Sequence, residues 1–411
     1  MDRRLKSKMK KCDPESFSIH DFLNEGKSSD AADTRFAEED CSGEVQKFFV
    51  VGGGGKVGSL TKEIANILTE TTGWKQKKDS HGRYHLVLGG NRGSGISWKS
   101  IGQFKWDFGI IPHCNCFRGY IWLTQKTKLI QVLRVGDIAD LMPESYLFFP
   151  STSEDNEIDG LRAAFEGGSK RGSTDNTWII KSADGTRGEK TFLMDNFDQI
   201  VEFLESQEQT SAPWAIQRYI SNPLLLPGGK KFDLRFFVLL DSRLNPYIAT
   251  EAVCKTCPDS FSLDDLTNTM AHLSIPGKNG ANQMPVEQLA KWLSSEHGVN
   301  YEQAVMTPVR ETITKVLAAS RPKLENVEHA EFTSFQVFAF DFLVDANLKV
   351  WFTEVSAVSS MPEQMVHEAA KDIFSIAIQP LFQEDEESRD GKKHSFFMPL
   401  VAETRVRNNK K

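Results

Sequence analysis

The pattern of hydrophobic and polar residues predicts structure most clearly in the segment 335–356, which reads FQVFAFDFLVDANLKVWFTEVS. Two apolar runs flank the sequence Asp-Ala-Asn at 345–347, and such residues are typical of tight turns. The segment therefore predicts a β-hairpin whose strands are buried on both faces. With Ala346 and Asn347 as a two-residue turn, Asp341 and Glu354 become diagonal neighbours on one face of the hairpin.

A second segment, 231–240, alternates strictly at its start. Its charged residues share one face of a predicted strand and its apolar residues share the other. A solvent-exposed face is the ordinary explanation of this pattern. A polyphosphate site is the alternative, because a glycine-rich flap and the carboxylate hairpin accompany the strand in the sequence. The charged set is Lys231, Asp233 and Arg235, and the apolar set is Phe232, Leu234 and Phe236.

Shorter apolar runs, separated by turn residues, predict the remaining elements. Strands are expected at 45–51, 85–88, 143–150, 178–181, 190–194, 214–220 and 247–255. Helices are expected at 60–72, 126–132, 197–207, 284–294, 301–319 and 362–381. Residues 151–176 are polar and rich in Gly and Ser, so we expect a loop or lid there. The mixture of elements predicts an α/β (α+β) fold.

The composition of the 411-residue chain is that of an ordinary globular protein, with 39% hydrophobic and 26% charged residues. Its net charge of -7 argues against nucleic acid as a partner. We expect a cytoplasmic protein without membrane contact, because no apolar run reaches spanning length and the basic start lacks a signal-peptide core. The six cysteines are too few for a disulfide framework. Reduced thiols are expected, with a four-thiolate zinc site at Cys114, Cys116, Cys254 and Cys257 as the alternative.

Two glycine-rich segments are candidate phosphate-binding loops. In the first, Gly53, Gly55 and Gly58 match G-x-G-x-x-G between a predicted strand and helix, which is typical of dinucleotide-binding domains. No acidic residue closes the next strand, so ordinary turn glycines are the alternative. Val57 follows the lysine of this loop, which excludes a Walker A motif because that motif requires Ser or Thr there.

The second glycine-rich segment lies between the predicted strands at 178–181 and 190–194. It contains Gly185, Arg187 and Gly188, and it follows Lys181. Backbone N–H groups of such a flap can cover phosphates, while the two basic side chains supply positive charge. The segment predicts an anion-binding flap without Walker spacing.

Asp341 stands between two phenylalanines in the hairpin that we expect to be buried. An unpaired buried carboxylate is costly, so this position predicts a cation, a hydrogen-bond donor or a raised pKa. Together with Glu354, Asp341 can bind Mg²⁺, which takes one or two protein carboxylates and fills its other positions with water and phosphate oxygens. The alternative is an ion pair with a Lys or Arg from elsewhere in the chain.

Three segments follow one another along the chain. The first is the strand that ends in Lys181 together with its flap, the second is a hinge followed by the charged strand of Lys231, and the third is the hairpin of Asp341. They read WIIKSADGTRGE, IQRYISNPLLLPGGKKFDLRFFVL and FQVFAFDFLVDANLKVWFTEV. Together they resemble the tubulin-tyrosine ligase family over about residues 45–383. The resemblance implies an ATP-grasp fold in which two lobes enclose the nucleotide. The amino-terminal region, with Lys126 and the sequence PESY, is more similar to the tyrosine ligase of that family than to its glutamylating members.

The resemblance and the composition divide the chain into five expected regions. These are a disordered polar arm with a basic start at 1–43, an amino-terminal α/β domain at 44–124, a central ATP-grasp lobe at 125–220, a carboxy-terminal ATP-grasp lobe at 221–384 and a polar tail at 385–411. The apolar residues 396–401 within the tail are expected to dock on the body of the protein or on a partner.

The resemblance also implies roles for individual residues. Arg235 and Lys255 would be catalytic and would face the amino-acid or acceptor carboxylates. Lys255 stands where the family usually has arginine, so its contact is that of a point charge. Magnesium would be bound by Asp341, Glu354 and Ser356. ATP would be held by Lys126, Lys181, Arg187, Gly188, Lys231, Asp233 and Ser274, with Gln217, Arg218, Tyr219 and Ile220 bordering the adenine.

The implied activity is ATP- and magnesium-dependent amide formation through an acyl phosphate. The acceptor would be the acidic C-terminal tail of tubulin and the amine would be free tyrosine, with glutamylation as the close alternative. The resemblance implies a cytoskeletal location, including the cilium or basal body, for a monomer or a one-to-one complex with the tubulin dimer. Ser356 and Ile275 each replace a family asparagine, which makes a weakened, tubulin-binding pseudoenzyme a further alternative. A third alternative is a nicotinamide-dependent oxidoreductase that uses the first glycine-rich loop.

Overall fold

The computed structural model describes thirteen stretches of the chain. The predicted arm at 1–43 lies outside them, as does most of the predicted tail. None of the helices within these stretches combines the length and the apolar character needed to cross a membrane. The stretches are 47–52, 57–78, 84–90, 95–101, 111–150, 156–169, 176–185, 188–207, 212–274, 282–324, 332–357, 361–382 and 394–400.

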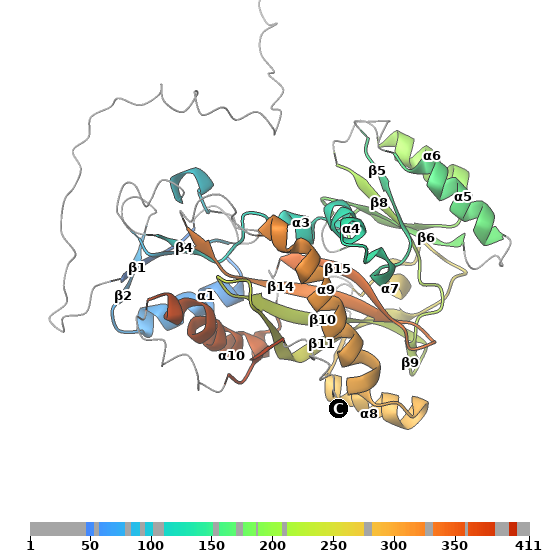
Figure 1. Cartoon of the computed structure of the whole chain (residues 1–411). Helices are drawn as coiled ribbons and strands as arrows, with labels where there is room; N and C mark the ends of the chain where they lie inside the picture. The colour runs from blue at the N-terminus through green and yellow to red at the C-terminus, as the bar shows by residue number, and fades with distance from the viewer. Residues whose placement is uncertain are drawn as a thin grey trace, which may run out of the picture. The chain divides into compact units, whose positions relative to one another are not determined.

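The first sheet is parallel and lies in the amino-terminal part of the described chain (Figure 1). Its strand order is β13-β4-β3-β1-β2. Helix α1 (Ser59–Glu70) connects its first two strands, as parallel neighbours require a crossover. The strands are β1 (Lys47–Val51), β2 (Trp74–Lys77), β3 (Leu86–Leu88), β4 (His113–Cys114) and β13 (Thr333–Ser334). The last of these comes from far along the chain and was not predicted.

The second sheet is antiparallel, with the order β5-β8-β6-β7. It comprises β5 (Ser145–Phe148), β6 (Trp178–Ser182), β7 (Thr191–Met194) and β8 (Trp214–Arg218). Helices α5 (Ile158–Ser169) and α6 (Phe197–Ser206) pack on it. The expectation of a loop or lid at 151–176 is therefore wrong for the residues of α5. Leu161 and Phe165, four residues apart, bury one face of this helix despite its glycines.

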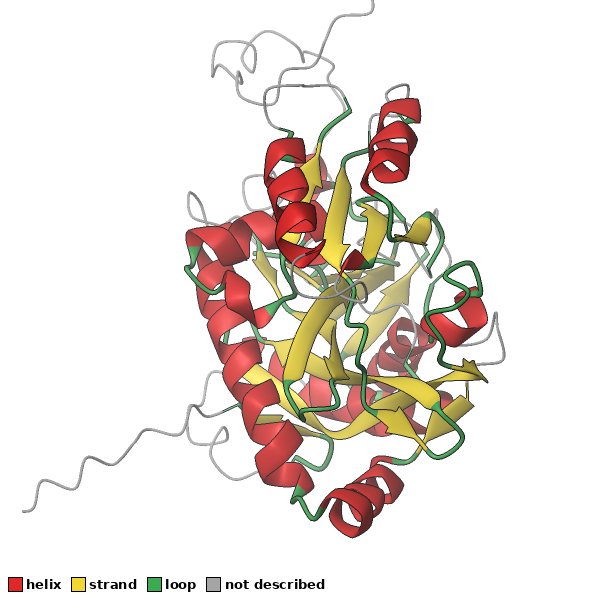
Figure 2. Ribbon diagram, turned by 90° about the vertical axis from the view of Figure 1, so that its right-hand side faces the viewer, coloured by secondary structure: helices red, strands yellow, loops and turns green. Residues whose placement is uncertain are grey.

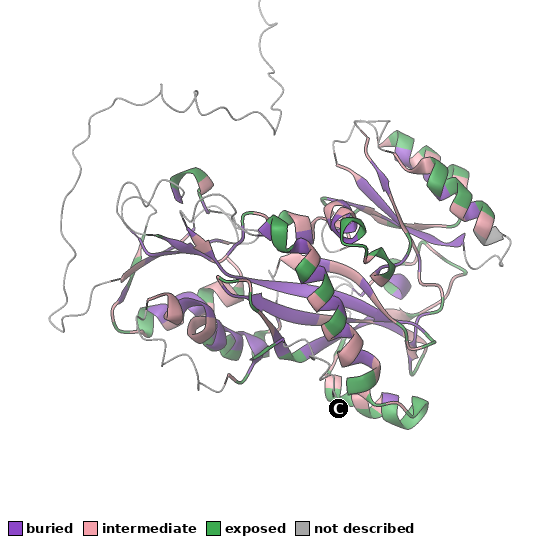
Figure 3. Cartoon of the chain, in the orientation of Figure 1, coloured by how far each residue is buried: buried purple, intermediate pink, exposed green. Residues whose placement is uncertain are grey.

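The third sheet has seven strands, with β10 (Lys230–Leu240) at its centre. Strands β11 (Pro246–Ser260) and β14 (Gln336–Val344) flank β10, and β15 (Val350–Ala357) follows β14. The central strands are buried along most of their length (Figure 3). The shorter strands are β9 (Leu225–Leu226), β12 (Asn282–Met284) and β16 (Phe397–Pro399).

Helices cover both faces of the seven-stranded sheet (Figure 2). On one face, α4 (Lys126–Val135), α8 (Val286–His297) and α9 (Thr307–Leu324) pack against Phe236 and Val238 of β10. On the other face, α1 and α10 (Glu363–Ile373) pack against Phe237 and Leu239. Short helical segments complete the fold at α3 (Ile121–Thr124), Ala139–Leu141, α7 (Thr269–His272), Glu302–Met306, Phe374–Ile378 and Gln379–Leu381. The predicted mixed α/β class is confirmed.

The β14–β15 hairpin differs from its predicted register. Asp341 pairs directly with Glu354, not diagonally, because the turn is wider than two residues and a bulge follows it at Thr353. The Asp345 carboxylate holds the turn by accepting the N–H groups of Asn347 and Lys349 at 2.8 and 2.9 Å. The expected burial on both faces is confirmed for β14, which is buried throughout, and is wrong for β15, most of which is half-buried.

The apolar residues of the predicted tail dock on the body of the protein. Strand β16 pairs with the first half of β11, and Phe396 and Phe397 enter the core beneath α10. The buried Asp372 of α10 holds this segment, because its Oδ2 accepts the backbone N–H groups of Phe396 and Phe397 at 2.8 and 2.7 Å. One carboxylate thus satisfies two buried donors.

Replacing Asp372 with Ala should lower the free energy of unfolding by about 2–4 kcal/mol, because two buried N–H groups lose their acceptor. Asp372→Asn should be milder, since an amide oxygen can still accept. Urea unfolding of both variants measures the effect. The matched control is Asp140→Ala at an exposed aspartate, and equal midpoints for Asp372→Ala and this control would contradict the assignment.

A second prediction concerns acid stability through His113, which is buried in β4 and contacts Thr333 of β13. Burial lowers the pKa of His113 from 6.5 to about 4, and His85 acts in the same direction. Between these values the unfolded chain binds a proton that the folded protein does not, so stability falls as the pH drops from about 6.5 to 4. We expect this loss to approach about 3 kcal/mol for this group.

Urea unfolding at pH 7 and pH 4 tests the prediction. The variant His113→Gln should lose less stability between the two pH values than the wild type does. The exposed His297→Gln is the control and should keep the wild-type difference. An unchanged pH difference in His113→Gln would show that this histidine does not contribute.

Candidate functional site

The candidate site lies where the polar end of β10 meets β11, β14 and β15. Lys231, Asp233 and Arg235 project from the same face of β10 as Phe237 and Leu239, which α1 and α10 cover farther along the strand. The change from charged to apolar residues on one face therefore marks the point where helical cover ends. The alternation that was predicted for this strand is present.

Asp341 is held by two cations from neighbouring strands. The guanidinium of Arg235 donates to both of its oxygens, with Nε–Oδ1 at 2.8 Å and Nη2–Oδ2 at 2.6 Å. The ammonium of Lys255 lies 3.5 Å from Oδ1. Burial alone would raise the pKa of Asp341, but the two cations lower it below its usual value. The alternative of an ion pair at Asp341 is thus what the structure contains.

Glu354 faces Asp341 across the hairpin and interacts directly with it. Ser356, two residues along β15, lies opposite Ala339 and on the same side as Glu354. A carboxylate has about four lone-pair positions, so Asp341 retains acceptor capacity beside its bonds to Arg235 and Lys255. Within the described ranges, no three His, Cys, Asp or Glu side chains gather as a metal site. A pair of carboxylates fits Mg²⁺, which needs no more than two from the protein when phosphate and water complete its shell.

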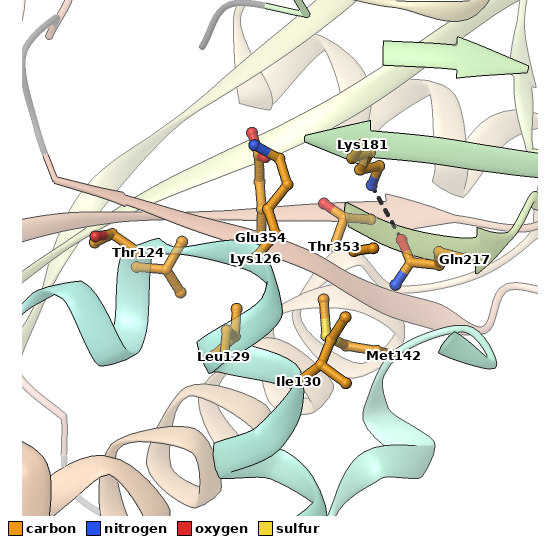
Figure 4. A pocket seen from close by; sticks show the side chains of 11 residues that line it. Thr124, Lys126, Leu129, Ile130, Met142, Lys181, Gln217, Thr353 and Glu354 are labelled. Atoms are coloured by element: carbon orange, nitrogen blue, oxygen red, sulfur yellow. Dashed lines mark hydrogen bonds between the residues drawn. The ribbon is translucent and has the colours of Figure 1, made fainter. Parts of the chain in front are cut away.

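Lys126 and Lys181 face Glu354 from two other elements (Figure 4). Lys181 of β6 donates to Oε1 of Gln217 on the adjacent β8 at 3.0 Å. Lys126, at the start of α4, donates to the carbonyl oxygen of Gly185 in the predicted flap at 3.0 Å. These residues line a pocket whose floor is apolar. The floor comprises Leu129, Ile130, Met142, Ala215 and Val355.

The protonation of Lys181 is set by its surroundings. Burial lowers the pKa of Lys181 to about 8; Glu354 opposes this shift, whereas Lys126 and Lys231 reinforce it. A buried ammonium beside two other cations is unfavourable unless anions approach it. The electrostatics of the pocket therefore favour an anionic ligand.

A second group of residues lies around His272, which is fully buried at the end of α7. Its Nδ1 hydrogen-bonds the Tyr219 hydroxyl at 2.9 Å, and its carbonyl oxygen accepts from Nζ of Lys231 at 2.6 Å. Two residues farther on, the Ser274 hydroxyl donates to Asp233. The segment after α7 is thus fixed against the charged face of β10. His272 was not among the predicted site residues, although it lies only two positions before the predicted Ser274.

The structure does not bring every predicted residue into the site. Arg218 points away, because it pairs with Glu144 at 2.6 Å and its guanidinium lies 4.4 Å from the centre of the Trp178 ring. Ile220 is half-buried after β8, and Gly188 has a positive φ of 72° in the turn before β7. Arg187 lies outside the described residues, as do Ile275 and the glycines at 53 and 55.

The zinc alternative is wrong for the four cysteines concerned. Cys114 lies in β4 of the first sheet and Cys116 packs in the same core cluster, whereas Cys254 and Cys257 lie in β11 of the third sheet. All four are buried free thiols, as the expectation of reduced cysteines requires. Burial raises the pKa of Cys254 and of Cys257 to about 12, so these thiols stay protonated at neutral pH.

Known proteins provide an independent comparison. The model of the tubulin-tyrosine ligase family matches residues 110–384. The probable tubulin polyglutamylase ttll-9 of Caenorhabditis elegans is 26% identical over 322 residues, covering 74% of this chain and 73% of that protein. Tubulin glycylases 3E and 3C of Tetrahymena thermophila are 28% and 26% identical over 242 and 223 residues, which cover 53% and 50% of this chain. The chain spans only 17% and 20% of these two glycylases.

The family match covers the charged strand, the flap and the carboxylate hairpin, and it gives no support to a nicotinamide-dependent enzyme. The relatives also bear on the finer expectation, because their names are those of a polyglutamylase and glycylases instead of a tyrosine ligase. The region matched by the family model, residues 110–384, is well over half of the sequence. The chain belongs to the tubulin-tyrosine ligase family.

Proposed function

We propose that this protein is an ATP- and magnesium-dependent ligase that joins an amino acid to a carboxylate of an acidic tubulin tail. The single observation that carries the proposal is the convergence of Asp341 and Glu354 on one face, next to Lys181. An ATP-grasp arrangement accounts for this geometry, since the second sheet supplies Lys181 and the third supplies the carboxylates.

The proposed reaction needs no nucleophilic side chain. The acceptor carboxylate attacks the γ-phosphorus of ATP and ADP leaves, which gives an acyl phosphate. The amino group of the second substrate then attacks the acyl carbon, and inorganic phosphate and a proton leave as the amide forms. Lys126 and Lys181 are placed to offset charge on the transferring phosphoryl group. When bound, magnesium would be held by Asp341, Glu354 and Ser356 and would neutralise phosphate oxygens.

Arg235 and Lys255 are proposed to orient substrate carboxylates. Their present partner is Asp341, so a substrate carboxylate would share them with it. The guanidinium of Arg235 can donate to two carboxylates at once, because it carries five N–H groups. On the nucleotide side, Lys231, Asp233, Ser274, Gln217 and Tyr219 are proposed to hold ribose and adenine.

The names of the relatives favour glutamate or glycine over tyrosine as the amino acid. Among them, the nematode polyglutamylase is matched over most of its own length. We therefore propose glutamate as the donor amino acid, with glycine next and tyrosine last. A cytoskeletal place of action follows from the same proposal.

The second candidate function is a tubulin-binding pseudoenzyme. It is favoured by Ser356, whose hydroxyl replaces an amide oxygen in the proposed metal shell, and by Ile275, which cannot hydrogen-bond. Water can take the place of the amide oxygen at Ser356. This candidate predicts tubulin binding without incorporation of any amino acid.

Replacing Glu354 with Gln should reduce magnesium-dependent ATP turnover by about 100-fold or more, because a neutral amide is a poor magnesium ligand. Steady-state ATP hydrolysis in the presence of tubulin measures the effect. The control is Glu363→Gln, at an exposed glutamate in the first turn of α10. Wild-type turnover in Glu354→Gln would remove the metal assignment.

The amino acid can be identified by incubating the protein with tubulin, ATP and each radiolabelled amino acid separately. We expect incorporation of glutamate, less of glycine and least of tyrosine, and none without magnesium. Incorporation of tyrosine alone would restore the tyrosine ligase assignment. Retained tubulin binding with no incorporation would favour the pseudoenzyme.

A further inference from the structure

A cationic and aromatic patch lies beside the candidate site, on elements that the proposed chemistry does not use. It consists of Arg118, Trp122, Lys128 and Lys323, which we call the Trp122 patch. Nζ of Lys128 is 4.7 Å and Nζ of Lys323 is 4.3 Å from the centre of the Trp122 ring. Two ammonium groups from different helices therefore share one indole.

Three elements meet at the Trp122 patch. Trp122 belongs to α3, Lys128 to α4 and Lys323 to the last turn of α9, whose end lies beside α3 and α4 (Figure 1). The turn before α3 touches the end of α9 so closely that a Cβ on Gly119 would lie 1.7 Å from the carbonyl oxygen of Lys323. This contact brings the backbone beside the exposed Arg118 close to the backbone of Lys323.

The positive charge of the patch is not neutralised within the part of the chain that the structure describes. None of Arg118, Lys128 and Lys323 makes an ion pair with a described carboxylate. The first turn of α4 also contains no acidic residue, although a helix N-terminus disfavours cations such as Lys128. Gathering these charges costs folding energy, and a polyanion bound there would offset that cost.

The backbone segments that carry Trp122 and Lys128 also carry residues of the pocket. Thr124 and Lys126 line the pocket that contains Glu354 (Figure 4), and Trp122 and Lys128 lie only two residues from them along the chain. Consecutive Cα atoms are about 3.8 Å apart, so each of these two residues lies within about 8 Å of a pocket residue. A peptide in an extended conformation covers this distance in about two or three residues.

We propose that the Trp122 patch binds the acidic polypeptide segment that flanks the acceptor carboxylate. The inference rests on the proposed function, because it assumes that the acceptor is an acidic tail. Charge complementarity selects the occupant: three unpaired cations suit a run of glutamates or aspartates. The indole holds the two lysines in position, which reduces the entropy lost when the peptide binds.

Fluorescence anisotropy with a labelled, glutamate-rich peptide tests the proposal without requiring catalysis. The variant Lys128→Gln/Lys323→Gln should weaken peptide binding by about tenfold, and added salt should weaken the wild type more than this variant. The matched control is Lys291→Gln/Lys315→Gln, which removes the same charge from two exposed lysines on α8 and α9. We expect the control to change binding by less than about twofold.

Equal weakening in both double variants would show that only net charge matters and would overturn the proposal, as would no peptide binding by the wild type. ATP affinity, measured in parallel, should be the same in all three proteins, and a loss confined to the Lys128→Gln/Lys323→Gln variant would indicate misfolding. In that event the milder Lys323→Gln, at an exposed residue, repeats the test and should weaken binding about threefold.

Peptide ligation that is unaffected by the patch variants would overturn the patch and leave the proposed function intact. Peptide binding that depends on the patch, with no ligation, would support the patch and overturn the proposed function.

Discussion

The interaction on which the site depends is the buried contact of Asp341 with Arg235 and Lys255. An isolated carboxylate at this depth would be unfavourable by several kcal/mol, and two cations from adjacent strands compensate for it. Because the three residues come from β14, β10 and β11, the contact also fixes how these strands align at their polar ends. Removing one partner would leave charge buried without compensation, so the site and the sheet depend on the same group.

Strand β10 shows how one element can serve both the core and the site. Its odd-numbered residues pass from Lys231, Asp233 and Arg235 to Phe237 and Leu239 on a single face, while its even-numbered residues from Phe232 to Leu240 are apolar. The pairing of β10 with β14 stays regular through this change, whereas the pairing with β11 shifts its register between Phe236 and Val238. Helices α1 and α10 cover only its apolar half, and the α7 segment packs against its charged half through His272 and Ser274.

Local patterns in the sequence predicted most of the fold, because alternation and helical spacing depend on neighbouring residues. They placed the strand of Lys231, the hairpin of Asp341 and helix α6. They did not predict the pairing of β13 with β4 or of β16 with β11, since those contacts join segments far apart in the chain. The hairpin register was wrong for a different reason. The Asp345 carboxylate stabilises a turn that is wider than predicted. The bulge at Thr353 then moves the partner of Asp341 one residue farther along β15, to Glu354.

The site residues differ in how far the sequence could determine them. The carboxylates and lysines were identified by type and order, but their joint position depends on the second and third sheets facing one another across Glu354. Five cations surround three carboxylates in the described part of the site, so it carries an excess of positive charge that favours an anionic ligand. Burial lowers the pKa of Lys181, and the neighbouring Lys126 and Lys231 lower it further. Arg235 and Lys255 lower the pKa of Asp341 against the effect of its burial. The cations are Lys126, Lys181, Lys231, Arg235 and Lys255, and the carboxylates are Asp233, Asp341 and Glu354.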